Sequence, residues 1–162
     1  MKVKLVPRAP DSLETVATVQ KAVPLVPGSE DDCCARVLDR TEVVGRDEAA
    51  KWLTFLKGLG LAREGSNGFS RIRTDPTTDS LREAFLDGVF GAEDVLSVLQ
   101  EADRPLGADE VFARFEDTVP QWERHKHPNS WDDVWSERVE RLLDWLVLLE
   151  LAVRTDAGYR AD

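Results

Sequence analysis

The sequence is poor in cysteine, with only two among its 162 residues, and these two are adjacent at positions 33 and 34. Adjacent cysteines cannot link distant segments, and the sequence has no Cys-x-x-Cys spacing that could hold a metal ion. We therefore expect a reducing compartment. Cys33 and Cys34 lie in a segment with the apolar spacing of a helix, which favours an ordinary core position over a redox device.

Long apolar runs are absent as well. No stretch approaches the roughly 18 apolar residues of a membrane-spanning helix. The first ten residues, MKVKLVPRAP, carry charges and two prolines where a signal peptide has its apolar region. We therefore expect a cytoplasmic protein without a membrane partner.

The motifs of common catalytic sites are missing too: there is no glycine-rich phosphate loop, no Gly-x-Ser-x-Gly and no cysteine with a positioned histidine. Carboxylates are abundant but show no paired spacing. His125 and His127 are two residues apart in a proline-bounded segment near Asp132 and Asp133, which is compatible with a metal site or a solvated loop. Because no third ligand stands at a recognised spacing, we predict no metal. Because the catalytic motifs are missing, we predict no cofactor and no enzymatic activity.

Negative charge, in contrast, is in excess. The sequence contains 31 Asp and Glu against 21 Lys and Arg, and 15 of these 21 are Arg. Such a composition is typical of a halophilic protein, because at molar salt the Debye length is only about 3 Å and self-repulsion is screened. The charge is uneven: residues 1–27 carry +2, residues 28–75 carry −1 and residues 76–162 carry −11. The two parts of the chain therefore face different partners, or one part faces none.

The first half has the element order of three helices followed by a hairpin. The helices are predicted within residues 11–23, 29–41 and 43–60. Asp11 and Ser29 are the expected N-caps of the first two helices, and the third is expected to end at Gly60. Residues 61–73 are predicted to form two short strands around a turn. This order is that of a winged helix-turn-helix.

The second half repeats this order at an offset of 90 residues. Its predicted helices lie within residues 78–103, 107–117 and 131–150, and its hairpin within residues 151–161. The identical pairs at this offset are Leu53/Leu143, Leu56/Leu146, Leu59/Leu149, Leu61/Leu151, Ala62/Ala152 and Gly68/Gly158. Aromatic residues recur as well, since Phe55 and Phe69 match Trp145 and Tyr159. We interpret this as an internal repeat whose second copy has an insertion at about residues 118–131.

On this pattern the chain resembles a tandem winged-helix (winged helix-turn-helix) protein of the small haloarchaeal regulatory type. The resemblance implies a mostly α fold with small β-hairpin wings (α+β), in two tandem modules. The expected first module, with an N-terminal arm that either pairs with a wing or stays loose, is residues 1–75. The expected second module is residues 76–162. The resemblance also implies that such modules usually bind DNA through the third helix and the wing, while a sizeable minority serve only in protein docking.

The third helix and the wing of the first module supply the candidate DNA-binding residues. These candidates are Arg46, Lys51, Thr54, Lys57, Arg63, Arg71 and Arg73. Helical spacing places Lys51 and Thr54 on the outward face of the third helix, where they would reach base edges, while the arginines would hold flanking phosphates. The alternative is a mixed solvent-exposed face of an acidic domain.

The corresponding face of the second module predicts a different use. Its outward residues include Glu137, Glu140 and Asp144, which would repel a phosphate backbone. Its third helix also has five consecutive apolar residues, 145–149, which spread around the helix. The predicted protein interface consists of Trp131, Trp135, Trp145, Val147 and Leu148. The alternative is that the first helix of this half covers the apolar residues within the same chain.

The sequence supports two functional hypotheses. The first is a DNA-binding transcriptional regulator, whose first module contacts DNA and whose acidic second module forms a homodimer or docks another protein through residues 118–149. The second is an adaptor or scaffold subunit in which neither wing contacts DNA, a hypothesis favoured by the charge of −11 in residues 76–162.

Overall fold

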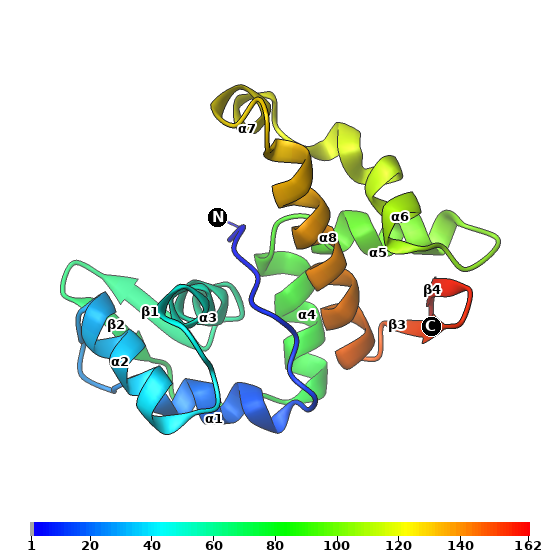
Figure 1. The fold of residues 1–162 in the computed structure, drawn as a ribbon. Coiled ribbons are helices and arrows are strands. Elements are labelled where there is room, and N and C mark those ends of the chain that lie inside the picture. Colours follow the sequence, from blue (N-terminus) through cyan, green and yellow to red (C-terminus); the bar gives the residue numbers. More distant parts are fainter. Residues whose placement is uncertain (1) are drawn as a thin grey trace. The chain divides into compact units, whose positions relative to one another are not determined.

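The computed structural model describes residues 2–162, and the chain folds into two compact units that divide between Phe90 and Gly91. Each unit consists of helices and one small antiparallel β-hairpin (Figure 1). This confirms the predicted mostly α fold with two hairpin wings. The units divide later than the expected module boundary after residue 75, because α4 (Thr78–Gly88) packs against α3 (Arg46–Gly58) within the first unit.

The first unit has three helices, a hairpin and one further helix. Its elements are α1 (Glu14–Ala22), α2 (Glu30–Arg40), α3 (Arg46–Gly58), β1 (Ala62–Gly65), β2 (Gly68–Arg71) and α4 (Thr78–Gly88). Ser29 caps α2 as predicted, because its Oγ accepts a hydrogen bond from the backbone N–H of Asp32 at 3.0 Å. The cap predicted at Asp11 is wrong: α1 begins later, at Glu14, and no side chain caps it.

The second unit repeats this arrangement with an insertion before its long helix. Its elements are α5 (Ala92–Glu101), α6 (Ala108–Phe115), the 3-10 helix η1 (Glu116–Thr118), α7 (Gln121–Lys126), α8 (Trp131–Leu148), β3 (Ala152–Thr155) and β4 (Gly158–Ala161). The strands β3 and β4 and the last residue of α8 lie 90 positions after β1, β2 and the last residue of α3. The insertion, for which a solvated loop was one expectation, contains the short helix α7.

A third strand segment joins each hairpin from the loop between the first two helices. In the first unit the backbones of Gly28 and Phe69 exchange two hydrogen bonds, at 2.8 and 2.9 Å. In the second unit Leu106 and Tyr159 make the same exchange, at 2.7 and 2.8 Å. The contact is so close that a Cβ at Gly158 would lie 2.4 Å from the Leu106 carbonyl oxygen, which explains why the wing needs glycine there.

The turn after the long helix is also built twice. In the first unit Gly60 has φ +74°, and its N–H donates to the carbonyl of Lys57 at 3.1 Å. In the second unit Glu150 has φ +61° and donates to the carbonyl of Val147 at 3.0 Å. The second copy therefore keeps a left-handed turn residue without keeping the glycine that adopts this conformation most easily.

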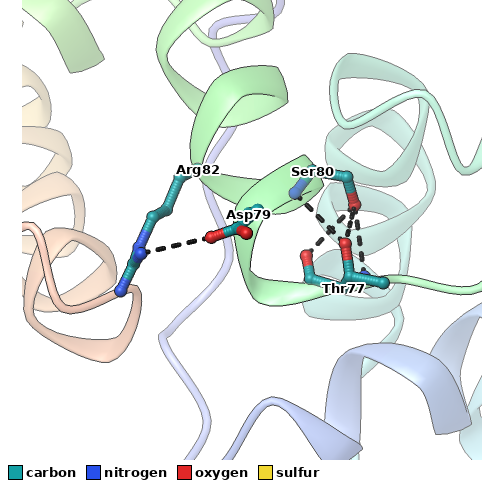
Figure 2. A network of polar contacts seen from close by, with 4 residues as sticks. All are labelled: Thr77, Asp79, Ser80 and Arg82. Carbon is teal, nitrogen blue, oxygen red and sulfur yellow. Dashed lines mark hydrogen bonds and ion pairs between the residues drawn. The ribbon is translucent and has the colours of Figure 1, made fainter.

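α4 is fixed by its cap and by a close helix crossing. At its start the Oγ1 of Thr77 accepts from the N–H of Ser80, and the Oγ of Ser80 accepts from the N–H of Thr77, both at 3.2 Å (Figure 2). Near its end a Cβ on Gly88 would lie 1.9 Å from the carbonyl oxygen of Gly58. Gly58 is therefore the place where the backbones of α3 and α4 meet, and its small size is a packing requirement.

The N-terminal arm pairs with the segment after α4 and not with a wing. The N–H of Val3 donates to the carbonyl of Gly88 at 2.9 Å, and the N–H of Phe90 donates to the carbonyl of Val3 at 2.8 Å. Val3 and Val89 form a parallel bridge, and both side chains are buried. The arm is thus part of the first unit's core, which gives α4 a second anchor in that unit.

Cys33 and Cys34 lie on α2 and are both buried, in agreement with a core position. The thiol of Cys33 donates to the carbonyl of Gly28 at 3.5 Å. Burial raises the pKa of both thiols, so both stay protonated and poorly nucleophilic at neutral pH.

Candidate functional site

The outer face of α3 is the first part of the candidate DNA-binding surface. Its inner face is buried as the helical spacing predicts, and Trp52, Leu53 and Leu56 are at most 2% exposed. Lys51 and Thr54 lie on the opposite side and are partly exposed. Neither residue makes an ion pair or a side-chain hydrogen bond within residues 2–162, so their polar atoms are available to a ligand.

Two other candidates on α3 are held by carboxylates. Arg46 at the start of α3 makes ion pairs with Glu30, at 3.8 Å, and with Asp31 in the first turn of α2. Lys57 in the last turn donates to Glu64 of β1 at 2.8 Å. These contacts tie α3 to α2 and to the wing. Exposed pairs of this kind stabilise a fold by roughly 0–1 kcal/mol, so a ligand carrying negative charge can replace the carboxylates.

The wing presents its arginines on different sides. Arg63 pairs with Ser70 in the β1–β2 register, and Arg71 pairs with Ala62. Because successive residues of a strand point to opposite faces, Arg63 lies on the outer face, whereas Arg71 shares the inner face with the buried Ala62. Arg71 is only partly exposed, and its Nε is buried without a hydrogen-bond partner in the described residues.

Arg73 follows β2 in a segment that a buried side chain holds in place. The amide of Gln20 donates to the carbonyls of Ile72 and Thr74, at 2.9 and 2.8 Å. Arg73 lies between these two anchored residues and is exposed. The seven candidates thus divide into an accessible group of Lys51, Thr54, Arg63 and Arg73, a paired group of Arg46 and Lys57, and the inward-facing Arg71.

The acidic start of α2 lies next to this surface. Glu30, Asp31 and Asp32 form its first turn and are exposed, and of the α3 cations only Arg46 reaches them within the described chain. A phosphate backbone is repelled at this end of the helix pair. The accessible cations are therefore best placed to meet a duplex from the side of α3 that faces the wing.

The corresponding face of α8 in the second unit is lined with carboxylates. Asp133, Glu137, Glu140 and Asp144 follow each other at spacings of four, three and four residues, which places them on one side of the helix. We call these four residues the α8 acidic stripe. Glu137 forms an ion pair with Arg141 at 2.9 Å.

At the end of the α8 acidic stripe the wing is bonded to the helix. The hydroxyl of Tyr159 donates to Asp144 Oδ1 at 2.9 Å, and the guanidinium of Arg154 lies 5.4 Å from the centre of the Tyr159 ring. Burial and the Asp144 carboxylate raise the pKa of Tyr159 to about 12. Asp144 occupies the position of Thr54, so the position predicted to reach base edges in the first unit takes part in an internal hydrogen bond in the second.

The predicted protein interface contains residues that the structure places in different environments. Trp135 and Trp145 are each 1% exposed, so neither is accessible, and their inclusion in a surface patch is corrected. The ring of Trp135 stacks on Phe115 with 6.1 Å between ring centres. Val147 and Leu148 are half-buried, and Trp131 is partly covered by the guanidinium of Arg124, 4.3 Å from its ring centre.

The exposed tryptophan of this region is Trp122, which lies within the predicted interface segment 118–149 but was not among the five residues named for the interface. Trp122 lies on α7 and is 53% exposed. Helical spacing of apolar residues pointed to α8, because α8 has a long periodic pattern and α7 has only six residues. The signal that could have indicated Trp122 is its isolation among polar residues in a proline-bounded segment.

The fold and these surfaces define the chain as a tandem winged-helix protein. The model of the halobacterial double winged helix domain family matches residues 1–162, and the chain belongs to this family. The comparisons with curated proteins and with solved structures give no match. No helix within residues 2–162 has the length and apolar character needed to cross a membrane. Residues 2–162 also contain no group of three or more His, Cys, Asp or Glu side chains arranged to hold a metal ion.

Proposed function

We propose that the chain is a non-enzymatic DNA-binding transcriptional regulator whose first unit contacts DNA. One observation carries the proposal: Lys51 and Thr54 on α3 and Arg63 on the outer face of the wing are accessible together. The equivalent face of α8 carries the α8 acidic stripe instead. The first unit holds 13 basic and 14 acidic residues, whereas the second holds 8 basic and 17 acidic residues. The first unit therefore repels phosphate much less than the second.

In the proposed complex the accessible residues have different roles. Lys51 and Thr54 face the major groove, where an ammonium donates to guanine O6 or N7 and a hydroxyl serves as donor or acceptor. Arg63 and Arg73 hold phosphates on either side. Arg46 and Lys57 join them by exchanging their carboxylate partners for phosphate, whereas the inward-facing Arg71 supports the wing. Two to four phosphate contacts give a salt slope of roughly −2 to −4 on logarithmic axes, so affinity falls as salt rises.

The test compares charge reversals inside and outside this surface. Binding to labelled genomic DNA fragments is measured by anisotropy over a series of KCl concentrations, for the wild type, Lys51→Glu and Arg63→Glu. Lys21→Glu is the matched control, because Lys21 is exposed on α1 and lies outside the candidate set. We expect each of the first two variants to weaken binding at least about tenfold, and Arg63→Glu to reduce the salt slope by about 1. The control should bind like the wild type.

Two results would contradict this proposal. One is a wild type that binds no fragment selectively. The other is a control that weakens binding as much as Lys51→Glu, because the effect would then follow net charge and not the surface. Either result favours the second candidate function, an adaptor in which neither unit contacts DNA. That candidate is supported by the α8 acidic stripe and by the net charge of −9 in residues 91–162.

The second unit is proposed to make a protein contact, as a homodimer or with another protein, through residues 118–149. Its long helix cannot approach a phosphate backbone with the α8 acidic stripe, and the hydrogen bond between Tyr159 and Asp144 holds one end of this stripe in place. The insertion before α8 adds the exposed Trp122. Exposed aromatic residues with cations beside them are common in protein interfaces, so the insertion is the best-supported part of this surface.

A further inference from the structure

α7 presents a small basic and aromatic surface in an otherwise acidic unit. His125 and Lys126 lie three and four residues after Trp122, so the three side chains are on one side of the helix. All three residues are exposed. The ammonium of Lys126 lies 5.9 Å from the centre of the Trp122 ring. We call these three residues the α7 patch. Within residues 120–130 the single carboxylate is Glu123, and it is 7% exposed, so the accessible surface there carries no negative side chain.

The α7 patch is held in place by contacts to its own unit. The guanidinium of Arg124 lies over Trp131 at the start of α8 and donates to the carbonyl of Glu116. The N–H of Trp131 donates to the carbonyl of His127 at 2.9 Å, which joins the end of the insertion to α8. α7 therefore keeps Trp122 exposed as part of a packed structure, and this exposure does not depend on a loose loop.

A complementary surface lies on the adjoining helix. The α8 acidic stripe includes Asp133, Glu137 and Glu140, which are all exposed. Beside these carboxylates lies Val134, which is 36% exposed although it is apolar. The second unit thus carries an aromatic surface with positive charge on α7 and an apolar surface with negative charge on α8, and these two helices are in contact.

We propose that these two surfaces bind each other in a symmetric dimer of the second unit. The Trp122 ring of one copy packs against Val134 of the other, and Lys126 faces Glu137 and Glu140. A two-fold axis repeats each contact, so one pair of complementary surfaces is used twice. This inference rests on the protein-contact role proposed for the second unit and is independent of DNA binding by the first.

The charge on the α7 patch favours a protein over a nucleic acid as its occupant. Arg124 contacts Trp131 and Glu116, which leaves Lys126 as the one exposed Lys or Arg side chain of α7. One or two phosphate contacts give only a shallow salt slope, too weak to overcome a unit of net charge −9. An apolar contact between Trp122 and Val134 does not weaken in salt, and the dimer is therefore expected to persist at molar KCl.

The first test is the mass of the chain in solution. Light scattering of the wild type should give twice the 18.2 kDa of one chain, and Trp122→Ala should raise the dimer dissociation constant by about 30-fold or more. Trp122 is exposed, so its removal should leave the circular dichroism spectrum unchanged. Leu25→Ala is the control, because Leu25 is an exposed apolar residue of the first unit, and this variant should dimerise like the wild type.

The second test exchanges charges between two chains. One variant carries His125→Glu and Lys126→Glu, and the other carries Glu137→Lys and Glu140→Lys. Each variant alone places like charges opposite each other twice and should be monomeric. Mixed together, the two variants place opposite charges at both contacts and should form a one-to-one dimer, which native mass spectrometry resolves.

Three outcomes would overturn the inference. The first is a wild type that remains monomeric at about 0.1 mM chain. The second is a dimer that Trp122→Ala does not weaken. The third is a pair of charge variants that fail to combine while each keeps its native spectrum. Loss of DNA binding in the Lys51→Glu chain with an unchanged dimer would leave the inference intact, and so would the absence of DNA binding in the wild type.

Discussion

Gly60 and Glu150 occupy equivalent turn positions with φ of +74° and +61°, so exchanging these residues measures the cost of a left-handed side chain. An L-residue in this conformation costs roughly 1–2 kcal/mol relative to the right-handed one. Introducing glycine returns roughly 0.4–1 kcal/mol of chain entropy to the unfolded state. We therefore expect Glu150→Gly to raise the free energy of unfolding by roughly 0.5–1 kcal/mol.

The reverse change in the first unit should have the opposite sign. No atom lies within 4 Å of a Cβ placed on Gly60, so Gly60→Glu adds backbone strain without a steric clash. We expect it to lower the free energy of unfolding by roughly 0.5–1 kcal/mol. Gly60→Ala should cost about as much, because the strain arises at the Cβ atom and not at the carboxylate.

The assay is urea unfolding at 25 °C followed by tryptophan fluorescence, with Glu83→Gly as the control. Glu83 is exposed in the middle of α4, where φ is negative and glycine should lower stability by about 1 kcal/mol. The two Glu→Gly changes should therefore differ in sign. If Glu150→Gly lowers stability as the control does, the strain assigned to Glu150 is wrong.

Two further predictions concern helix ends. Gly88→Ala places a methyl group where the Gly58 carbonyl oxygen lies and should destabilise the first unit by roughly 2–3 kcal/mol in the same urea assay, and an unchanged midpoint would mean that the helices do not cross at these residues. The Arg104 guanidinium and the Gly107 N–H lower the pKa of Glu110 to about 2 from 4.5. Since the folded pKa is the lower one, this carboxylate stabilises the fold above pH 4.5 and ceases to do so as pH falls to about 2. The stability difference between the wild type and Glu110→Gln should disappear over that range, and a difference that persists at pH 2 would contradict the assignment.

The repeat and the buried faces could be predicted because they depend on local pattern. Apolar spacing identified the inner face of α3, and the offset of 90 placed the second hairpin at the right residues. The position of α4 could not be predicted in this way, because periodicity shows that a segment is helical and not which unit it packs against. The close approach of Gly88 to Gly58 decides that point, and it is a contact between residues 30 positions apart.

The sequence could indicate which residues lie on the candidate surface, but not which of their side chains form ion pairs or are buried. The ion pairs of Arg46 with Asp31 and of Lys57 with Glu64 depend on how α2 and the wing are placed around α3. Alternation of side chains along a strand places Arg63 and Arg71 on opposite faces of the hairpin, but this follows only once the register of the hairpin is known. The burial of Trp135 was missed because its cover comes from α6, through Phe115.

The differences between the two copies are linked, and this linkage keeps a carboxylate on the outer face of α8. Phe69 of the first wing is replaced by Tyr159, which has a buried hydroxyl that needs an acceptor. The acceptor is Asp144, at the position of Thr54, so the change in the wing is matched by a carboxylate on the outer face of the helix. Restoring threonine at this position alone would replace the carboxylate by a shorter hydroxyl and leave three carboxylates of the α8 acidic stripe in place. Conversely, Gly58 cannot become a leucine like its counterpart Leu148, because the Val3 side chain and the Gly88 carbonyl occupy the space. In each unit, contacts inside the fold therefore limit which side chains the outer face of the long helix can carry.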